Sequence, residues 1–373
     1  MIRNSSVRRR LARVRGSAPQ RWAAKRPFAS VVVGTKHNPL DLPPEVYLEK
    51  SPPPPRDEVD SLALFYSDWA EMPLGPRHRF PIDKYERVRQ ILSAEPRVRL
   101  HRGPLATCAE ACLAHEKDYV ESIVTGTMSE KSRKRVGFNE APLKSYVLRS
   151  LASLGATIAA TRRAVSSSDP RERVWSGAVS GGTHHAFASM GDGFCVFNDI
   201  AVSARIAQRE FGIKSIMILD LDVHQGNGTA EILANDEDIY TLSVHQAKGF
   251  PFSTRAQSDL DIPLADNCSD ADYMQALQCL PKIFEAKKPE LVFYQAGVDG
   301  LAGDRFGRFS LSRAGLMERN SLVYNLATEF GAPIVTTMGG GYHKDIAQTI
   351  ECSADVFRQM IVSLSPEEDR AVR

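Results

Sequence analysis

The segment DLDVHQGNG, residues 220–228, carries side chains that bind metal ions. It follows the apolar run SIMIL, which predicts a buried strand that delivers the segment to the end of a sheet. Alternate residues of an extended chain point the same way, so Asp222 and His224 can reach one ion, and Asp220 shares their direction. Carboxylate and imidazole ligands without sulfur suit Zn²⁺, Mn²⁺ or Fe²⁺.

Three further groups of residues have the types that a metal-dependent reaction needs. Asp299, at the end of a later apolar run, is the best-placed third ligand, and three ligands leave a coordination position open, as in catalytic zinc sites. The adjacent imidazoles of His184 and His185, in a glycine-bounded turn, both need polar partners and are candidates for general base and acid. Tyr342 follows three glycines that let the backbone turn, so its hydroxyl can face a developing oxyanion.

Strand-like apolar runs alternate with amphipathic helical patterns from about residue 150 onward. The strands are expected at 215–222, 239–245, 290–299 and 333–341, and the helices at 198–212, 270–288 and 312–331, with Gly212 and Gly331 as helix ends. This alternation predicts an α/β fold with a central, mostly parallel sheet flanked by helices. Ligands of such sheets bind beyond the carboxyl ends of the strands, where the polar residues of these strands fall.

Five motifs in this order, GGTHHA, GDGFCVFND, DLDVHQGNG, AGVDGLAGD and GGGY, resemble the zinc-dependent histone deacetylase family. The resemblance covers roughly residues 62–360, and HQGNG is similar to the class IV branch. It implies a single-domain arginase/deacetylase-like α/β fold and one zinc ion per chain, bound by Asp222, His224 and Asp299. The implied reaction is hydrolysis of N-ε-acyl-lysine in histone or non-histone proteins.

The resemblance also implies a role for each remaining polar residue of the site. His185 would be the general base and His184 its electrostatic or acid partner, with Asp220 orienting His184. Tyr342 would polarise the amide carbonyl. Asn227 stands where most relatives outside class IV have an acid. Its neutral amide can orient His185 but cannot stabilise the imidazolium, so a lower histidine pKa is expected than beside an aspartate.

The walls of the site follow from the same resemblance. An acyl-lysine channel would be lined by Gly193, Phe194, Gly340 and either Phe250 or Phe252. A structural K⁺ is also implied, near Asp220, Ser243 and the backbone around 222–244. The acidic substrate-gripping loop of class I relatives has no evident counterpart, because the stretch 129–140, SEKSRKRVGFNE, is basic.

Three rival functions remain beside protein-lysine deacylation. One is a deacylase of small acetylated amines such as polyamines, which an acidic pocket wall would favour. Another is a catalytically silent module that binds acyl-lysine, although intact ligands, both histidines and the tyrosine argue against it. A di-manganese ureohydrolase is disfavoured because DVHQGN lacks the extra acid that would bridge a second ion.

The charge of the chain is unevenly distributed. Nine of its 47 Lys and Arg residues lie in the first 30 residues, and no acid precedes Asp41. The other 38 bases stand against 45 acids, so the rest of the chain has a net charge of −7, which argues against direct nucleic-acid binding. The six cysteines are scattered and suggest reduced thiols. No run of about 18 apolar residues predicts a membrane span.

Four regions are expected along the chain. Residues 1–35 form a basic tail that is typical of a mitochondrial or plastid transit peptide; the alternative is a disordered tail or nuclear address on a nuclear or cytoplasmic protein. Residues 36–61 are interpreted as a linker because they end in SPPPPRDE. The deacetylase catalytic domain would span 62–365, and 366–373 would be a flexible C-terminus. The sequence predicts no particular oligomeric state.

Overall fold

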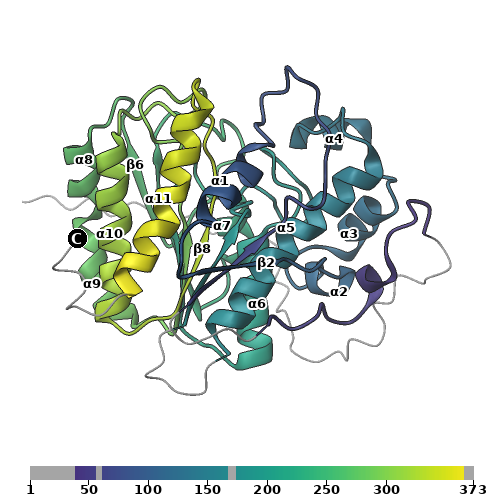
Figure 1. Ribbon diagram of the computed structural model, residues 1–373, viewed down its shortest axis with the longest axis horizontal. Coiled ribbons are helices and arrows are strands. Elements are labelled where there is room, and N and C mark those ends of the chain that lie inside the picture. The colour runs from purple at the N-terminus through teal and green to yellow at the C-terminus, as the bar shows by residue number, and fades with distance from the viewer. Residues whose placement is uncertain (1–37, 56–60, 167–173, 365–373) are drawn as a thin grey trace, which may run out of the picture. The chain divides into compact units, whose positions relative to one another are not determined.

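A computed structural model describes residues 38–55, 61–166 and 174–364, which form one α/β body (Figure 1). Its centre is an eight-stranded sheet with the order β2-β1-β3-β8-β7-β4-β5-β6. Every pair of neighbouring strands is parallel. The predicted α/β fold with a parallel sheet flanked by helices is confirmed. The expected tail 1–35 and the C-terminus 366–373 lie outside the described residues.

Four strands in the middle of the sheet are buried along their whole length. They are β3 (Trp175–Val179), β8 (Ile334–Thr337), β7 (Leu291–Gln295) and β4 (Ile216–Asp220). Near-continuous apolar runs are typical of parallel strands covered on both faces. The outer strands are β1 (Leu62–Tyr66), β2 (Val98–Arg102), β5 (Ile239–Gln246) and β6 (Leu260–Leu264). The sequence predicted β4, β5, β7 and β8 and did not identify the other four.

Long helices flank the sheet. In Figure 1, α10 (Arg313–Glu329) and α11 (Ile346–Leu364) run beside each other, and α11 also packs against α1 (Lys84–Leu92). The longest helix, α5 (Leu143–Ala164), packs against β1, β3 and β8 and contacts α6 (Asp199–Phe211). The shorter helices are α2 (Cys108–Ala111), α3 (Lys117–Val124), α4 (Glu130–Val136), α7 (Asn227–Leu233), α8 (Asp270–Ala276), α9 (Leu280–Lys287) and the 3₁₀ turns η2 (Pro44–Tyr47) and η3 (Leu277–Cys279).

Local chemistry explains where several helices begin and end. The Asn198 side chain accepts a hydrogen bond from the Ala201 amide at the start of α6, which ends at the left-handed Gly212. Gly331, with φ of 66°, follows α10, so both predicted glycine ends are confirmed. The single helix expected over 270–288 is wrong, because it is divided into α8, η3 and α9. Pro281 lies in the first turn of α9, where its missing N–H is tolerated.

The described part of the expected linker, residues 38–55, packs onto the body. Leu42 and Val46 are buried in the core. The Ser51 amide and hydroxyl both donate to Glu110 Oε1, and Arg162 Nη1 donates to the Ser51 hydroxyl. Two apolar side chains and one serine in a buried ion-pair cluster thus give this segment contacts that its proline content does not suggest. In the described part of the chain, no helix is long and apolar enough to cross a bilayer.

The register of the sheet aligns the strand ends that carry the predicted chemistry. Asp220 of β4 pairs with Gln295 of β7, Gln295 with Thr337 of β8, and Thr337 with Ala178 of β3. The carboxyl ends of the four central strands are therefore level. The segments that follow them enter the same space, which is where parallel sheets bind ligands.

Candidate metal and acid–base site

The three predicted metal ligands meet at the carboxyl ends of β4 and β7. His224 Nδ1 lies 3.0 Å from Asp222 Oδ1 and 3.1 Å from Asp299 Oδ2. All three side chains are buried, and one ligand atom of each lies within 4.8 Å of the others. Buried carboxylates need a compensating charge, so this arrangement can hold a single metal ion.

Two properties of the cluster fit a divalent cation. Apart from the ion-pair contact with His224 Nδ1, Asp299 Oδ2 accepts no hydrogen bond among the described residues. Burial lowers the pKa of His224, but Asp299 and Asp222 outweigh this effect and raise the pKa to about 10. A field that holds a proton on an imidazole also attracts a metal ion, whose binding displaces that proton.

Asp222 is held in place by groups from β7 and from the segment that follows β8. Its Oδ2 accepts a hydrogen bond of 2.9 Å from the Gly340 amide and lies 3.5 Å from Gln295 Nε2. A Cβ at position 340 would collide with Asp299, so only glycine lets the backbone approach the two carboxylates. Gln295 also accepts from the Thr337 hydroxyl. The sequence did not identify Gln295; its signal is a polar residue that ends an apolar strand.

Asp220 faces the histidine pair. Its Oδ2 lies 2.6 Å from His184 Nδ1, and both groups are buried. Burial lowers the pKa of His184, but the carboxylates of Asp220 and Asp222 outweigh it and raise the pKa to about 9. His184 is therefore protonated at neutral pH. Asp220 also pairs with Ser243 in the register of β4 and β5, and the potassium ion expected near these two residues stays a prediction.

The partner of His185 fixes its tautomer. Asn227 Nδ2 donates to the Thr254 carbonyl at 2.9 Å, so Oδ1 of the same amide points at His185 Nδ1, at 2.7 Å. An amide oxygen only accepts, so Nδ1 carries the proton and Nε2 is left with a lone pair. Burial lowers the pKa of His185 well below its ordinary value, and the positive charges of His184 and His224 add to the shift.

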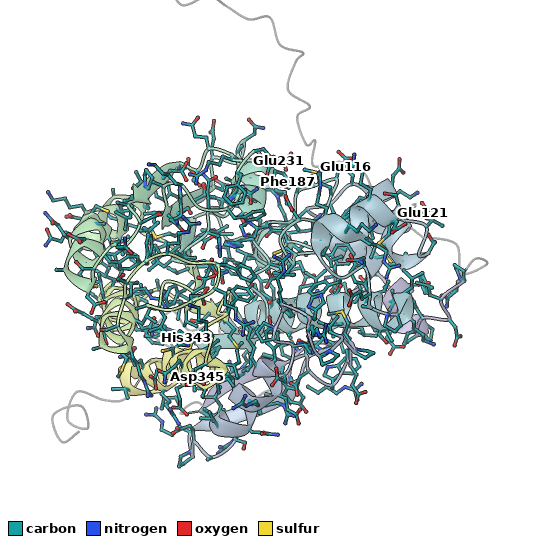
Figure 2. All side chains as sticks on the ribbon, turned by 90° about the horizontal axis from the view of Figure 1, so that it is seen from above. Glu116, Glu121, Phe187, Glu231, His343 and Asp345 are labelled. Carbon is teal, nitrogen blue, oxygen red and sulfur yellow. The ribbon has the colours of Figure 1, made fainter. Side chains whose placement is uncertain are left out.

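The loop after the histidine pair is fastened by groups from three helical segments; Figure 2 labels Phe187 of this loop and Glu116 and Glu231 near it. The Glu116 amide donates to the Ala188 carbonyl at 2.8 Å, and the Ala188 amide donates to Glu231 at 3.3 Å. The imidazole of His115 donates from Nδ1 to the Phe187 carbonyl and accepts the Asn198 amide at Nε2. Burial lowers the pKa of His115 to about 4, so it is neutral.

Tyr342 is anchored through its backbone and its ring. Its amide donates to Asp304 Oδ2 at 2.7 Å, and its ring lies 4.9 Å from that of Phe306. The ring of the neighbouring His343 lies with Nε2 3.1 Å from the Ala302 carbonyl and with Nδ1 beside the amide and carbonyl of Asp345; Figure 2 labels His343 and Asp345. Burial and the charge of Asp299 raise the pKa of Tyr342 well above its ordinary value, so its hydroxyl stays protonated.

Lys84 binds the backbone of the glycine run 339–341. Its buried ammonium donates to the Gly339 and Gly341 carbonyls at 3.2 and 3.3 Å and lies 5.0 Å from the centre of the Tyr342 ring. Burial lowers the pKa of Lys84 to about 8 against the opposing effect of nearby carboxylates. The sequence missed Lys84 and Asp304. Asp304 closes the AGVDGLAGD motif, whereas nothing distinguishes Lys84 from other lysines of the chain.

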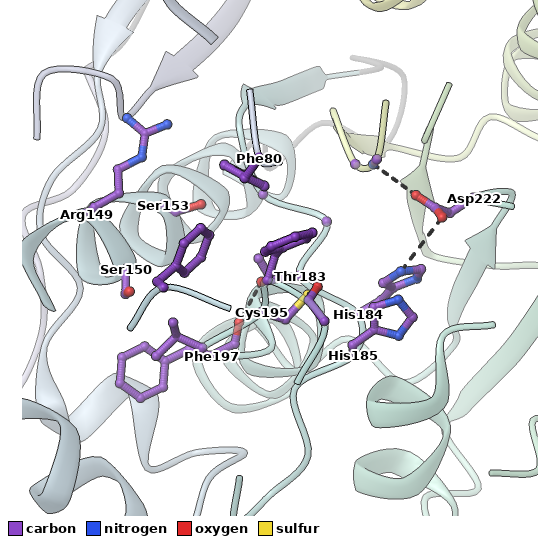
Figure 3. Close-up of a pocket in the computed structure, with 18 of the residues that line it drawn as sticks. Phe80, Arg149, Ser150, Ser153, Thr183, His184, His185, Cys195, Phe197 and Asp222 are labelled. Carbon is purple, nitrogen blue, oxygen red and sulfur yellow. Dashed lines mark hydrogen bonds and ion pairs between the residues drawn. The ribbon is translucent and has the colours of Figure 1, made fainter. Parts of the chain in front are cut away.

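Two cavities meet at the cluster. The outer cavity has a volume of about 300 Å³ and the inner cavity about 80 Å³; both are lined by His185, Gly193, Phe194, His224 and Tyr342. Figure 3 shows the inner cavity between the Arg149, Ser150 and Ser153 side of α5 and the His184, His185 and Asp222 side. Together the cavities form a channel that passes the metal cluster.

The predicted channel residues lie along its wall. Gly193 has φ of 50°, and a Cβ there would crowd His185 and Phe250. The Phe250 ring lies 4.8 Å from the His185 ring, whereas Phe252 is 81% exposed at the mouth. The structure thus brings Phe250, Gly193 and Phe194 to the channel, and Gly340 to the inner cavity.

Comparison with known proteins assigns the family. Residues 78–360 match the model of the histone deacetylase domain. The chain belongs to the histone deacetylase family. It is 36% identical to an uncharacterized protein of Picosynechococcus over 76% of this chain and 92% of that protein. It is 34% identical to histone deacetylase 2 of Arabidopsis thaliana over 57% of this chain and 55% of that protein.

Two further similarities concern another member of the family and the fold. Histone deacetylase 10, chloroplastic, of Oryza sativa subsp. japonica is 28% identical over 69% of this chain and 61% of its own length. The crystal structure of the HDA15 HD domain superposes with a TM-score of 0.65 at 21% identity, over 82% of this chain and 88% of that one. This deacetylase-family chain therefore has the arginase-like fold and is a hydrolase. The class IV-like branch stays a prediction.

Proposed function

We propose that this protein hydrolyses the N-ε-acyl amide of lysine side chains in proteins, with one zinc ion bound by Asp222, His224 and Asp299. One observation carries the proposal. Beside the ligand cluster, the amide oxygen of Asn227 faces His185 Nδ1 and leaves Nε2 free to accept a proton, whereas the carboxylate of Asp220 faces His184 Nδ1 and raises the pKa of that imidazole. Two groups whose environments push their pKa values apart are what acid–base hydrolysis of an amide requires.

The residues of the chain divide the reaction among them. A bound zinc ion supplies Lewis-acid polarisation of the acyl carbonyl and lowers the pKa of water. His185 Nε2 takes a proton from the attacking water as the new C–O bond forms, and the Tyr342 hydroxyl donates to the developing oxyanion. The C–N bond then breaks as a protonated histidine of the pair gives its proton to the lysine nitrogen. The products are a carboxylate and a free lysine amine.

The channel gives the substrate its direction. The lysine stem would lie in the outer cavity between Phe194 and Phe250, with the acyl group pointing toward the inner cavity. The amide of Asn227, which replaces an acid, supports assignment to the class IV-like branch. The length of acyl chain that the inner cavity accepts is left to experiment.

A panel of fluorogenic acyl-lysine peptides with graded acyl chains tests the proposal. Turnover of at least one member is expected, with loss on treatment with a chelator and recovery on addition of zinc. Absence of turnover with every acyl length, at full zinc occupancy, would instead favour a silent acyl-lysine-binding module. Recovery with another divalent ion but not with zinc would contradict the choice of metal.

A deacylase of small acetylated polyamines is the rival that the surface disfavours. Such cations need acidic groups near the mouth of the channel, since burial of an unpaired charge is costly. The described residues that line the outer cavity include five basic side chains and one acidic one, Asp192. Acetylated polyamines should therefore be poorer substrates than acetyl-lysine peptides in the same assay.

We also propose import into a plastid or mitochondrion. The support is the arginine-rich, acid-free composition of residues 1–35 and the similarity to a rice relative that is named chloroplastic. Fluorescent fusions with and without residues 1–30 test this. Organellar signal that depends on these residues is expected, and nuclear signal in both fusions would refute the import.

A further inference from the structure

Basic side chains from four separate segments surround the mouth of the outer cavity. Arg79 precedes α1, Lys134 and Arg135 lie near the end of α4, Lys248 follows β5, and Arg308 follows β7. All five are exposed. We call them the basic mouth. Asp192, the acidic residue in the described lining of this cavity, is buried and accepts a hydrogen bond from the Gly193 amide.

Most of the positive charge of the basic mouth is not neutralised. Among the described residues, Arg79, Arg135 and Lys248 have no carboxylate within ion-pair distance; Arg79 lies 5.6 Å from the centre of the Phe306 ring, and Arg135 contacts the sulfur of Met190. Lys134 pairs with Glu130 and Arg308 with Asp266, but both pairs are exposed to solvent. Exposed pairs of this kind contribute little energy and exchange partners readily.

The basic mouth lines the outer cavity, which the proposed substrate has to enter. Once an acyl-lysine reaches His185, His224 and Tyr342, its neighbouring residues must lie at the mouth, beside these charges. We propose that the preferred substrates are acyl-lysine segments flanked by Asp or Glu. This inference rests on the proposed function and names its substrate class. Basic flanking residues would bring like charges together and are disfavoured.

A nucleic-acid ligand fits the same charges less well. Phosphate backbones require an extended row of bases, whereas these bases ring an opening whose walls include the aromatic rings of Phe194, Phe250 and Phe306. The chain beyond residue 30 also has a net charge of −7. The aromatic walls of the cavity suit the neutral acyl-lysine side chain, and the positive charges of the basic mouth suit acidic residues on either side of that lysine.

Three acetyl-lysine peptides of equal length, with acidic, neutral or basic flanking residues, test the inference on the zinc-loaded full chain. At low salt, about 50 mM, kcat/KM should be about tenfold higher for the acidic than for the basic peptide. The ratio should fall toward one at about 500 mM salt, where exposed charges are screened. Equal kcat/KM for the three peptides at low salt would overturn the inference.

Charge-reversed variants locate the effect. In the double variant Arg135→Glu, Lys248→Glu, the acidic-to-basic ratio should fall at least about tenfold. The matched control Lys214→Glu, Lys282→Glu makes the same change in net charge at exposed positions before β4 and on α9, outside the mouth. It should keep the wild-type ratio. An equal fall in both double variants would mean that overall charge, not the basic mouth, sets the preference.

Direct binding separates this inference from the proposed function. If no peptide is hydrolysed, the proposed function is wrong, and fluorescence anisotropy with the same labelled peptides still tests the mouth. The acidic peptide should bind about tenfold more tightly than the basic one at low salt. Equal binding, or displacement of the acidic peptide by a DNA oligonucleotide at a lower concentration than by unlabelled peptide, would overturn the acidic-segment assignment.

Discussion

His185 faces the amide oxygen of Asn227 at 2.7 Å, a partner that orients the imidazole without stabilising its protonated form. The neighbouring His184 faces a carboxylate at 2.6 Å. The pKa values of these adjacent histidines are therefore shifted in opposite directions. Burial lowers the pKa of His185 well below its ordinary value, whereas Asp220 and Asp222 outweigh burial at His184 and raise its pKa. Both imidazoles are buried, so their partners make the difference: His184 faces two carboxylates, whereas His185 faces a neutral amide and two positively charged histidines.

Replacing Asn227 with Asp should raise the pKa of His185. A carboxylate at hydrogen-bond distance stabilises the imidazolium and raises the histidine pKa by about one to three units. The base acts only when unprotonated, so the acidic limb of the kcat/KM profile should move to higher pH by about that amount. Profiles of both proteins at equal zinc content give the measurement. An acidic limb that does not move would mean that the amide is not the partner of the catalytic base.

The Tyr342→Phe variant isolates the hydroxyl. The Tyr342 ring packs against Phe306, and its backbone amide donates a hydrogen bond to Asp304. Neither contact involves the hydroxyl oxygen, so the variant should keep the fold and the zinc content. Loss of one donor to the oxyanion should lower kcat by about two to three powers of ten. Turnover and metal analysis of the same preparation test both halves, and unchanged kcat would exclude the oxyanion role.

The Asp222→Ala variant should lose the metal as well as the activity. Asp222 provides an oxygen 3.0 Å from His224 Nδ1, and its removal leaves two ligands in the cluster. Zinc per chain after dialysis should fall well below that of the wild type. Asp238→Ala, an exposed aspartate before β5, is the matched control and should keep its zinc. A fully occupied Asp222→Ala variant would contradict the ligand assignment.

The sequence revealed the centre of the fold because local pattern and chemistry coincide there. The runs that became β4, β5, β7 and β8 are apolar, and polar residues follow them directly. Parallel sheets bring such ends together, so Asp222, His224 and Asp299 were predicted to converge, and the structure brings them within hydrogen-bond distance. The strands β2 and β6 could not be predicted, because polar residues interrupt the apolar pattern of β2 and a proline lies within β6.

Contacts between distant segments could not be predicted in this way. Lys84 reaches carbonyls more than 250 residues away, and Ser51 joins an ion pair between Glu110 and Arg162. Neither residue differs in local context from an exposed one. The five side chains of the basic mouth likewise come from four segments, and only one segment, 129–140, looked basic in the sequence. Such groupings depend on tertiary structure and leave no local signal.

Lys84→Met should weaken the support of the glycine run. The variant keeps the apolar stem but removes the donor to two buried carbonyls, Gly339 and Gly341. Unsatisfied buried acceptors should lower the free energy of unfolding by about 2–4 kcal/mol. Urea unfolding gives the measurement, with the exposed Lys282→Met as the matched control, which should change stability by less than about 0.5 kcal/mol. Equal stability of the two variants would show that Lys84 is not a structural anchor.

His115 should make the fold sensitive to mild acid. Its imidazole donates to the Phe187 carbonyl and accepts the Asn198 amide, so a second proton would face an N–H group. Burial lowers its pKa to about 4, below an ordinary value of 6.5, so the unfolded chain binds the proton more tightly. Above pH 6.5, His115 is neutral in both the folded and the unfolded chain and costs the fold no stability. As the pH falls from 6.5 toward 4, the unfolded chain takes up the proton first, and the free energy of unfolding decreases. Between pH 7 and pH 5 the loss should be about 2 kcal/mol.

The His115→Gln variant separates this titration from the rest of the molecule. Glutamine offers a donor and an acceptor but no ionisable group, so its free energy of unfolding should fall by about 2 kcal/mol less between pH 7 and pH 5 than that of the wild type. Urea unfolding of both proteins at the two pH values gives the comparison, and any pH-independent cost of the substitution cancels in it. An equal fall in the free energy of unfolding of both proteins would mean that the pKa of His115 is the same in the folded and the unfolded chain. The loop after His185 would then not depend on the neutral form of His115.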